Sequence, residues 1–190
     1  MRLYTMANDR MLPHFLRWHD LVSIFFPDLS VHVIPFNDDC DDLGTAIAQR
    51  NDVSLVTPSG RVDAIGKTIF EEEDYRPGIP SWRYFRKLNA FSDHSDPFIF
   101  MDANTIPLCD IRLFLDFDRL SDEDILFGQH SLPDRTVKDP IARSYLDLLI
   151  PGHGVGFNCG WFAATGGFLS LDCAQAMAKK TLRKIIGQAP

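Results

Sequence analysis

Two kinds of hydrophobic pattern follow one another along the chain. Apolar residues recur near helical spacing in three segments, which predicts helices at 7–26, 81–93 and 172–187. Between them lie short runs rich in apolar and β-branched residues, which predict five strands. These runs are RLYTM, SVHVIPF, PFIFM, DILFGQH and GFNCGWFAA, at 2–6, 30–36, 97–101, 124–130 and 156–164.

The run at 97–101 shows no polar alternation, which is typical of a strand buried on both faces of a parallel sheet. Strands that alternate with helices in this way predict an α/β domain with a Rossmann-like, mostly parallel sheet flanked by helices. Residues 54–80 contain the turn sequences TPSG and RPGIPS, so we expect an irregular surface excursion there. The length of 190 residues suits one domain, 1–190.

Polar side chains follow the first three predicted strands. Because the carboxyl ends of parallel strands meet at one edge of a sheet, where such folds bind ligands, we expect these side chains to form one site. They are Thr5 and Asn8 after the first strand, Asp38 and Asp39 after the second, and Asp102 and Asn104 after the third.

The chemistry of these side chains suits a nucleotide and a metal ion. Thr5 and Asn8 can hydrogen-bond a base or ribose, and a carboxylate after the second strand can accept from a base N–H or a ribose hydroxyl. Asp102, with the amide oxygen of Asn104 nearby, can bind a hard divalent cation. A plainer alternative is that these residues only form turns and helix caps.

A basic stripe is predicted on the helix that leads into the third strand. Arg83 and Lys87 are four residues apart and share one helix face, with Arg86 beside them. Such a stripe can hold a diphosphate. The alternative is a solvated face, or pairing with the acidic run at 71–74.

Composition narrows the choice of function. The chain is 45% hydrophobic with a formal net charge of −7, so it is globular and a poor candidate for binding nucleic acid. Its four cysteines have no CxxC spacing, which argues against zinc and against a disulfide framework. No signal peptide and no apolar run long enough for a membrane helix is visible, so we expect a cytoplasmic protein.

Three stretches, in this order, resemble the GT-A nucleotide-sugar glycosyltransferases, in particular glycosyltransferase family 8 with its glycogenin and galactosyltransferase-like members. LYTMAND is similar to the first strand and nucleotide-binding turn of that family. FIFMDANTIPLCDIRLFLDF is similar to the block that carries its DxD motif, and GFNCGWF is similar to its FNSG strand. The resemblance covers about 2–172.

The resemblance implies a UDP-sugar or related donor, a Mn²⁺ or Mg²⁺ ion, and transfer of the sugar to an acceptor hydroxyl on a saccharide, lipid or protein. Carried over by position, it places Thr5 and Asn8 at the nucleoside and Arg83 or Lys87 at the diphosphate. It places Asp102 at the ribose or metal, and Asn104 at the main metal-ligand position. Asn158 would lie near the transferred sugar.

The sequence departs from the family in two respects. It reads D-A-N where the family has D-x-D, so one negative charge is missing, and metal affinity should fall. The family's later Asp-Gln segment and its metal-binding histidine would lie beyond Pro190. Two alternatives to a glycosyltransferase are therefore kept. The first is a non-catalytic nucleotide- or sugar-binding module, or a subunit that needs a partner to complete its site. The second is an unrelated flavodoxin-like binding protein.

Overall fold

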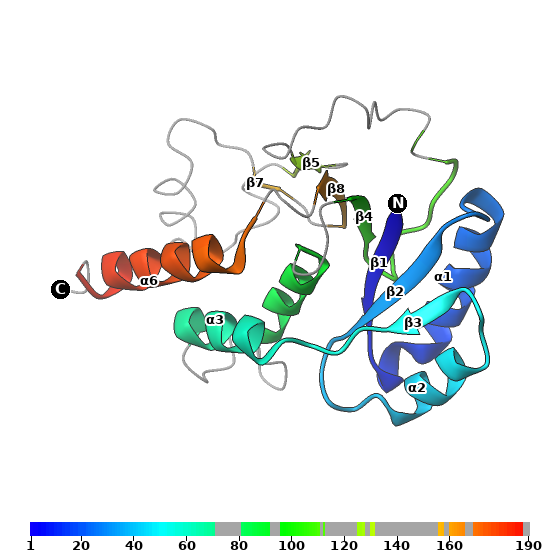
Figure 1. Ribbon diagram of the computed structural model, residues 1–190, viewed down its shortest axis with the longest axis horizontal. Helices are drawn as coiled ribbons and strands as arrows, with labels where there is room; N and C mark the ends of the chain where they lie inside the picture. Colours follow the sequence, from blue (N-terminus) through cyan, green and yellow to red (C-terminus); the bar gives the residue numbers. More distant parts are fainter. Residues whose placement is uncertain are drawn as a thin grey trace.

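A six-stranded mixed sheet forms the centre of the computed structural model (Figure 1), in the order β3-β2-β1-β4-β8-β5. The structure describes residues 1–70, 81–91, 96–110, 112, 125–127, 130–131, 156–157, 160–165 and 169–187. Strands β1 to β4 pair in parallel, whereas β8 is antiparallel to both β4 and β5. The strands of this sheet are β1 (Arg2–Ala7), β2 (Ser30–Pro35), β3 (Val53–Leu55), β4 (Pro97–Met101), β5 (Ile125–Phe127) and β8 (Trp161–Thr165). A separate pair joins β6 (His130–Ser131) to β7 (Gly156–Phe157).

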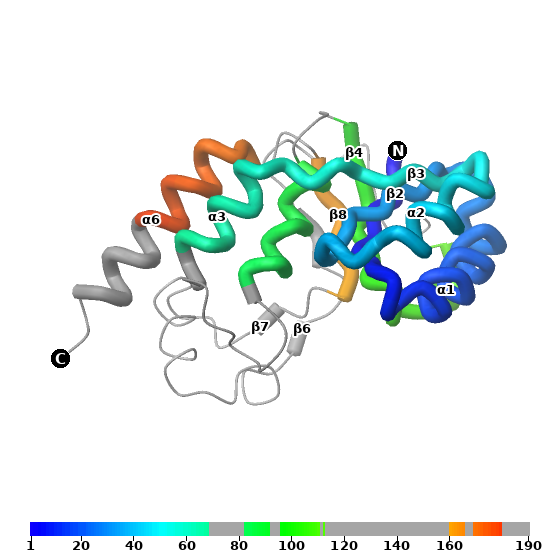
Figure 2. The backbone as a smooth tube through the Cα atoms, turned by 90° about the horizontal axis from the view of Figure 1, so that it is seen from below, coloured from blue at the N-terminus to red at the C-terminus, as the bar shows by residue number. Residues whose placement is uncertain are grey.

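Helices lie on both sides of this sheet (Figures 1 and 2). A 3₁₀ turn, η1 (Asp9–Met11), leads into α1 (Leu12–Phe25), and α2 (Asp41–Ala48) lies beside them. On the other side, α3 (Gly60–Phe70), the 3₁₀ helix η2 (Ser81–Phe91) and α6 (Leu171–Gly187) pack together. The chain therefore has the predicted three-layer α/β architecture.

Side-chain alternation along the strands divides the core into two clusters. Leu3 and Ala7 of β1 pack against Phe15 and Trp18 of α1, whereas the alternating neighbour Tyr4 faces the η2 side. On that side the rings of Phe91, Phe98, Phe100 and Phe162 contact one another, with centroid distances between 4.9 and 6.0 Å. The central strand β4 is buried on both faces, as its uninterrupted apolar run predicts.

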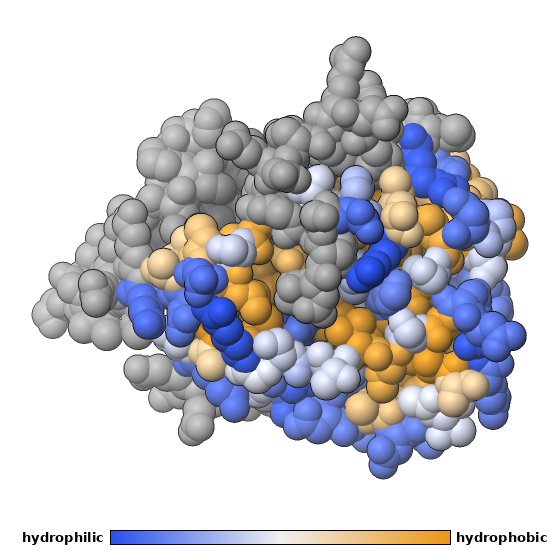
Figure 3. All heavy atoms as spheres, viewed as in Figure 1, coloured by the Kyte–Doolittle hydropathy of each residue, from blue (hydrophilic) through white to orange (hydrophobic). Residues whose placement is uncertain are grey.

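Several apolar side chains of the described part also reach the surface. Figure 3 shows hydrophobic residues between hydrophilic ones on the face seen in Figure 1. Ile106 and Leu108, which follow β4, are among the most exposed of the large apolar side chains. Scattered exposed apolar residues are ordinary on protein surfaces, so they do not by themselves mark a site.

The predictions for several regions need correction, and α2 was not predicted at all. Residues 54–70 are not irregular: β3 ends at Leu55, and α3 covers Gly60–Phe70. The strand predicted at 124–130 is not one strand, because its described residues belong to β5 (Ile125–Phe127) and, at His130, to the separate β6–β7 pair. The strand predicted at 156–164 is two strands, β7 and β8. The predicted helix at 172–187 is confirmed, and the one at 7–26 is confirmed from Asp9 onward, where it begins with η1. The helix predicted at 81–93 is the 3₁₀ helix η2 over Ser81–Phe91, and 92–93 lie outside the described residues.

The strand order excludes the flavodoxin-like alternative. In a flavodoxin-like sheet the order is 2-1-3-4-5, so that the first strand lies beside the third. Here β1 lies between β2 and β4, and β3 is the edge strand beyond β2. This arrangement brings the loops after β1, β2 and β4 to one edge.

Gly66 in α3 provides a test of how closely the helices pack. A Cβ at Gly66 would lie 2.6 Å from the carbonyl oxygen of Trp82 in η2, whereas a Cβ at Gly44 in α2 would meet nothing within 4 Å. We expect Gly66→Ala to lower the free energy of unfolding by about 1 to 3 kcal/mol, because the backbone of η2 must move.

Gly44→Ala is the matched control, and it should raise stability by about 0.5 to 1 kcal/mol through helix propensity alone. Urea denaturation of both variants checks this. Equal stability gains in the two variants would show that α3 and η2 do not approach each other as described.

Candidate nucleotide-sugar site

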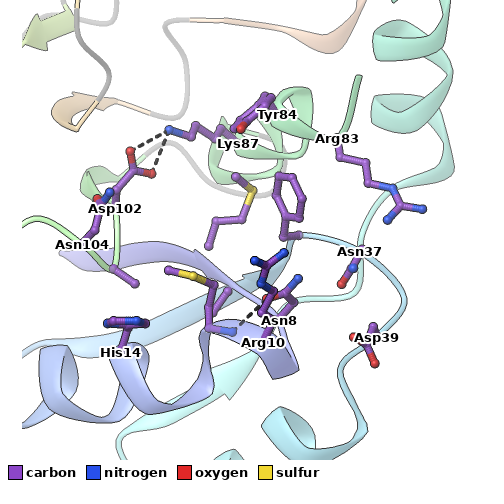
Figure 4. A pocket seen from close by; sticks show the side chains of 15 residues that line it. Asn8, Arg10, His14, Asn37, Asp39, Arg83, Tyr84, Lys87, Asp102 and Asn104 are labelled. Atoms are coloured by element: carbon purple, nitrogen blue, oxygen red, sulfur yellow. Dashed lines mark hydrogen bonds and ion pairs between the residues drawn. The ribbon is translucent and has the colours of Figure 1, made fainter. Parts of the chain in front are cut away.

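A cavity of about 710 Å³ opens at the carboxyl ends of β1, β2 and β4 and is bordered on one side by η2 (Figure 4). Its size suits a small-molecule ligand. Among the residues predicted from sequence, Asn8, Asp39, Arg83, Lys87, Asp102 and Asn104 all line it. The loops after β1, β2 and β4 therefore border one cavity.

Hydrogen bonds of Asn8 and Asp9 hold the turn after β1 in place. The Asn8 side-chain oxygen accepts a hydrogen bond from the backbone N–H of Met11 at 3.1 Å, so Asn8 caps η1 as predicted. Asp9 caps the neighbouring helix instead: its carboxylate accepts from the N–H groups of Asp42 and Leu43 at 3.2 and 2.8 Å. The Asp9 N–H in turn donates to the carbonyl of Asp39, which fixes the second loop against the first.

The loop after β2 contributes the side-chain amide of Asn37, which was not predicted from the sequence. The Asn37 side-chain oxygen is buried and has no hydrogen-bond partner within the described part of the chain. Because a buried polar atom without a partner is costly, an acceptor at the wall of a cavity suits a ligand N–H or O–H. Beside it, the rings of Phe36 and Tyr84 meet edge to face with centroids 5.4 Å apart, and both line the cavity.

At the other end of the cavity, Asp102 and Lys87 form an ion pair. Lys87 Nζ lies 2.8 Å from Oδ1 and 3.1 Å from Oδ2 of Asp102 (Figure 4). Burial raises the pKa of the Asp102 carboxyl, while the neighbouring ammonium acts in the opposite direction. The predicted diphosphate-binding lysine and the predicted metal-binding aspartate thus contact each other.

Apart from the Asp39 carboxylate, the other charged side chains that line the cavity are arginines. Arg83 lies over the Trp82 ring, 5.3 Å from its centroid, and its Nε is buried without a hydrogen-bond partner in the described part. Arg10 and His14, on the opposite wall in Figure 4, were not predicted from the sequence. In a chain with net charge −7, two arginines without a described carboxylate partner favour an anionic ligand.

Three predicted site residues are placed elsewhere. Thr5 is completely buried on the α1 side of β1, because strand alternation puts it on the same face as Leu3. Arg86 is 4% exposed, and its guanidinium donates to Asp63 at 2.8 and 2.9 Å, to Asp38 at 3.1 Å and to the Pro35 carbonyl at 3.2 Å. Asp38 therefore pairs with Arg86 and does not line the cavity, whereas Asp39 does.

Arg86 accordingly has a structural role in this chain. The hydrogen bonds to Asp63 raise its pKa above the ordinary value for arginine. It joins η2 to α3 and to the loop after β2, and so fixes the helix that carries Arg83 and Lys87. Asn158, predicted to lie near the transferred sugar, falls outside the described residues.

The residues at the carboxyl end of β4 do not fit the expected metal ion. Both Asp102 oxygens contact Lys87, and Asn104 is exposed. Among the residues that the structure describes, no three His, Cys, Asp or Glu side chains gather to hold an ion. The Mn²⁺ or Mg²⁺ ion stays a prediction from the sequence.

Of the missed residues, those that follow β1 and β2 could have been found from position alone. Asn37 and Phe36 directly follow β2, so they share the edge at which the other loops meet. Arg10 and His14 follow Asn8 by two and six residues and begin the helical segment at that edge. No sequence signal shows that Tyr84 reaches the cavity, because this depends on the packing of η2 against Phe36.

Comparison with solved structures identifies the fold as that of glycosyltransferases. A structure of the galactosyltransferase LgtC in complex with donor and acceptor sugar analogues matches 100% of the chain with a TM-score of 0.66 and 13% identity. The bifunctional glycosyltransferase WbbM matches with a TM-score of 0.59 and 13% identity over 96% of the chain. The glycosyltransferase GlyE of Streptococcus pneumoniae matches with 0.52 and 11% identity over 98% of the chain. The predicted resemblance in fold is confirmed.

The likeness is one of structure. No protein-family model matches the sequence, and a search of curated proteins finds no match. The chain spans 66% of LgtC, 34% of WbbM and 43% of GlyE, so it covers less than two thirds of each of them.

No helix among the described residues has both the length and the apolar character required to cross a membrane. The predicted cytoplasmic location stays a prediction.

Proposed function

We propose that the protein is a glycosyltransferase whose cavity binds a nucleotide-diphosphate sugar, with a UDP-sugar as the expected donor. The observation that supports this most directly is the cavity itself. It lies at the carboxyl ends of β1, β2 and β4, and amides, two aromatic rings and three basic side chains border it. The likeness in fold to three glycosyltransferases supports the same conclusion.

The chemistry of each wall suggests how a donor would lie. Asn8, Asn37 and Asp39 offer hydrogen-bonding groups for a base and a ribose, and Tyr84 offers an aromatic surface. Arg83 and Lys87 stand on η2, and their positive charge would face the diphosphate. The sugar would then point toward the end of the cavity that Asp102 and Asn104 border.

The reaction would depend on electrostatic stabilisation of the leaving group. The acceptor oxygen bonds to the anomeric carbon while the bond from that carbon to the phosphate oxygen breaks. The nucleoside diphosphate leaves with the electron pair, and the acceptor hydroxyl releases its proton to water. Positive side chains held in place beside the departing diphosphate lower the barrier because they need not reorganise.

A ligand panel tests the proposal. Melting temperature is measured with UDP, GDP and their hexose conjugates, each with EDTA or with Mn²⁺. A ligand at 100 times its Kd should stabilise the protein by about 2.7 kcal/mol. The release of nucleoside diphosphate from the preferred donor is then followed over time.

We expect one nucleoside diphosphate to raise the melting temperature and its sugar conjugate to be consumed. Stabilisation without consumption, even with added acceptor saccharides, would favour the non-catalytic binding module. No stabilisation by any nucleotide would contradict the proposed site.

A further inference from the structure

We propose that Lys87 takes the place of the divalent cation, so that this chain binds the diphosphate of its donor without a metal ion. The inference rests on the proposed function and concerns the same cavity. It is drawn from the ion pair between Lys87 and Asp102 together with the neutral residue at Asn104.

Hydrogen bonds hold the backbone that carries Asp102 in place. Its backbone N–H donates to the Gly160 carbonyl at 2.8 Å, which joins the end of β4 to the start of β8. Its own carbonyl accepts from the N–H of Thr105 at 2.8 Å, and the Thr105 hydroxyl donates to the Gly160 carbonyl at 3.1 Å. The backbone after β4 thus forms a turn, as the plainer interpretation of the sequence predicts. The carboxylate of Asp102 points from this turn toward Lys87 (Figure 4).

The Lys87 ammonium is held as firmly. Its side chain is 17% exposed, and Nζ lies 4.8 Å from the centroid of the Phe100 ring. A lysine fixed in this way has already lost most of its rotamer freedom, so little more is lost when an anion binds beside it. Asp102 therefore acts as a positioning residue for Lys87.

The charges at this point oppose a divalent cation. Lys87 neutralises the one negative charge of Asp102, and Asn104 adds none. A dication bound to the Asp102 oxygens would lie beside an ammonium that is 2.8 to 3.1 Å from the same oxygens. The other carboxylate that lines the cavity, Asp39, lies at the opposite end in Figure 4. The Lys87 ammonium, held beside Asp102, provides at this point the cationic group that a metal would otherwise bring to the diphosphate.

The first experiment measures UDP binding to the whole chain by calorimetry in buffer with EDTA and again with Mn²⁺. We expect the two affinities of the unchanged protein to be indistinguishable. Mn²⁺ titrated alone and followed by electron paramagnetic resonance should show no specific binding.

Two double variants then test whether the Lys87 ammonium or a metal ion contributes to UDP binding. Lys87→Met with Asp102→Asn removes both charges and preserves side-chain volume, and it should bind UDP about tenfold or more weakly in both buffers. Lys87→Met with Asn104→Asp leaves two carboxylates and no ammonium, and it should bind Mn²⁺ and regain UDP affinity only when Mn²⁺ is present. Lys179→Met removes one exposed positive charge from α6 and is the control, with unchanged UDP affinity.

The outcomes distinguish this inference from the proposed function. UDP binding by the unchanged protein that requires Mn²⁺ would overturn the inference and leave the proposed function intact. Full UDP affinity in the Lys87→Met, Asp102→Asn variant would also overturn the inference and leave the proposed function intact. No UDP binding by the unchanged protein in either buffer would overturn both.

Discussion

Replacing Arg86 by alanine is expected to lower the free energy of unfolding by about 3 to 5 kcal/mol. Arg86 is 4% exposed, and its guanidinium donates to two carboxylates and one carbonyl. The Asp63 side chain that it pairs with is only 20% exposed. Without Arg86, Asp63 keeps a mostly buried charge that has lost its hydrogen-bond donors, which is the costly outcome for a buried pair. Guanidinium chloride denaturation measures the change.

Arg61→Ala is the matched control for this prediction. Arg61 also pairs with a carboxylate, Asp172, but both side chains are exposed, at 45% and 85%. An exposed pair of this kind contributes about 0 to 1 kcal/mol, so the control should lose little stability. If the two alanine variants lose the same stability, Arg86 does not hold η2 in place as the structure indicates.

Arg83→Met is expected to weaken the binding of UDP about 10- to 100-fold while the protein stays folded, because charge-assisted hydrogen bonds to phosphate contribute about 1.5 to 3 kcal/mol. Arg83 lines the cavity, and no described carboxylate pairs with it. The change in stability should therefore stay within about 0.5 to 1 kcal/mol. Calorimetric titration and thermal melting of the same preparation measure both quantities.

Arg61→Met is the matched control for Arg83→Met. Arg61→Met removes the same charge at a distance from the cavity and should leave UDP affinity unchanged. If Arg83→Met binds UDP as the unchanged protein does, Arg83 does not contact the diphosphate, and its position at the cavity wall has another explanation.

The sequence was sufficient to predict the central layer. The runs at 2–6, 30–36 and 97–101 are apolar enough to be strands in any context, and their spacing by helical segments permits few arrangements other than an α/β sheet. Because ligands bind at the carboxyl ends of such strands, the order of strands and polar residues along the chain was enough to assign Asn8, Asp39 and Asp102 to one edge.

The helix α3 was missed for a physical reason. The start of α3 looks like a turn, because Gly60 ends the sequence TPSG. Gly66 also argued against a helix, since glycine is a poor helix former. Gly66 is instead a packing requirement, because only a residue without a side chain allows the Trp82 carbonyl to approach so closely. Local propensity was overridden by a contact with η2, which the sequence does not display.

The roles within the basic stripe could not be separated from the sequence either. Arg83, Arg86 and Lys87 look equivalent in a helical pattern, but their partners come from other elements. Asp63 of α3 and Asp38 after β2 pair with Arg86, and Asp102 pairs with Lys87, so Arg83 alone is left without a described carboxylate. Thr5, in contrast, could have been assigned to the core, because strand alternation already places it on the face of Leu3.

A methionine-methyl NMR titration with UDP locates the nucleotide site directly. The chain has five methionines: Met6 and Met11 line the cavity, whereas Met1 and Met177 are exposed and lie outside it. We expect saturating UDP to shift the methyl signals of Met6 and Met11 and to leave those of Met1 and Met177 unchanged. Unchanged Met6 and Met11 signals, or shifts confined to Met177, would contradict the placement of a nucleotide at the carboxyl ends of β1, β2 and β4.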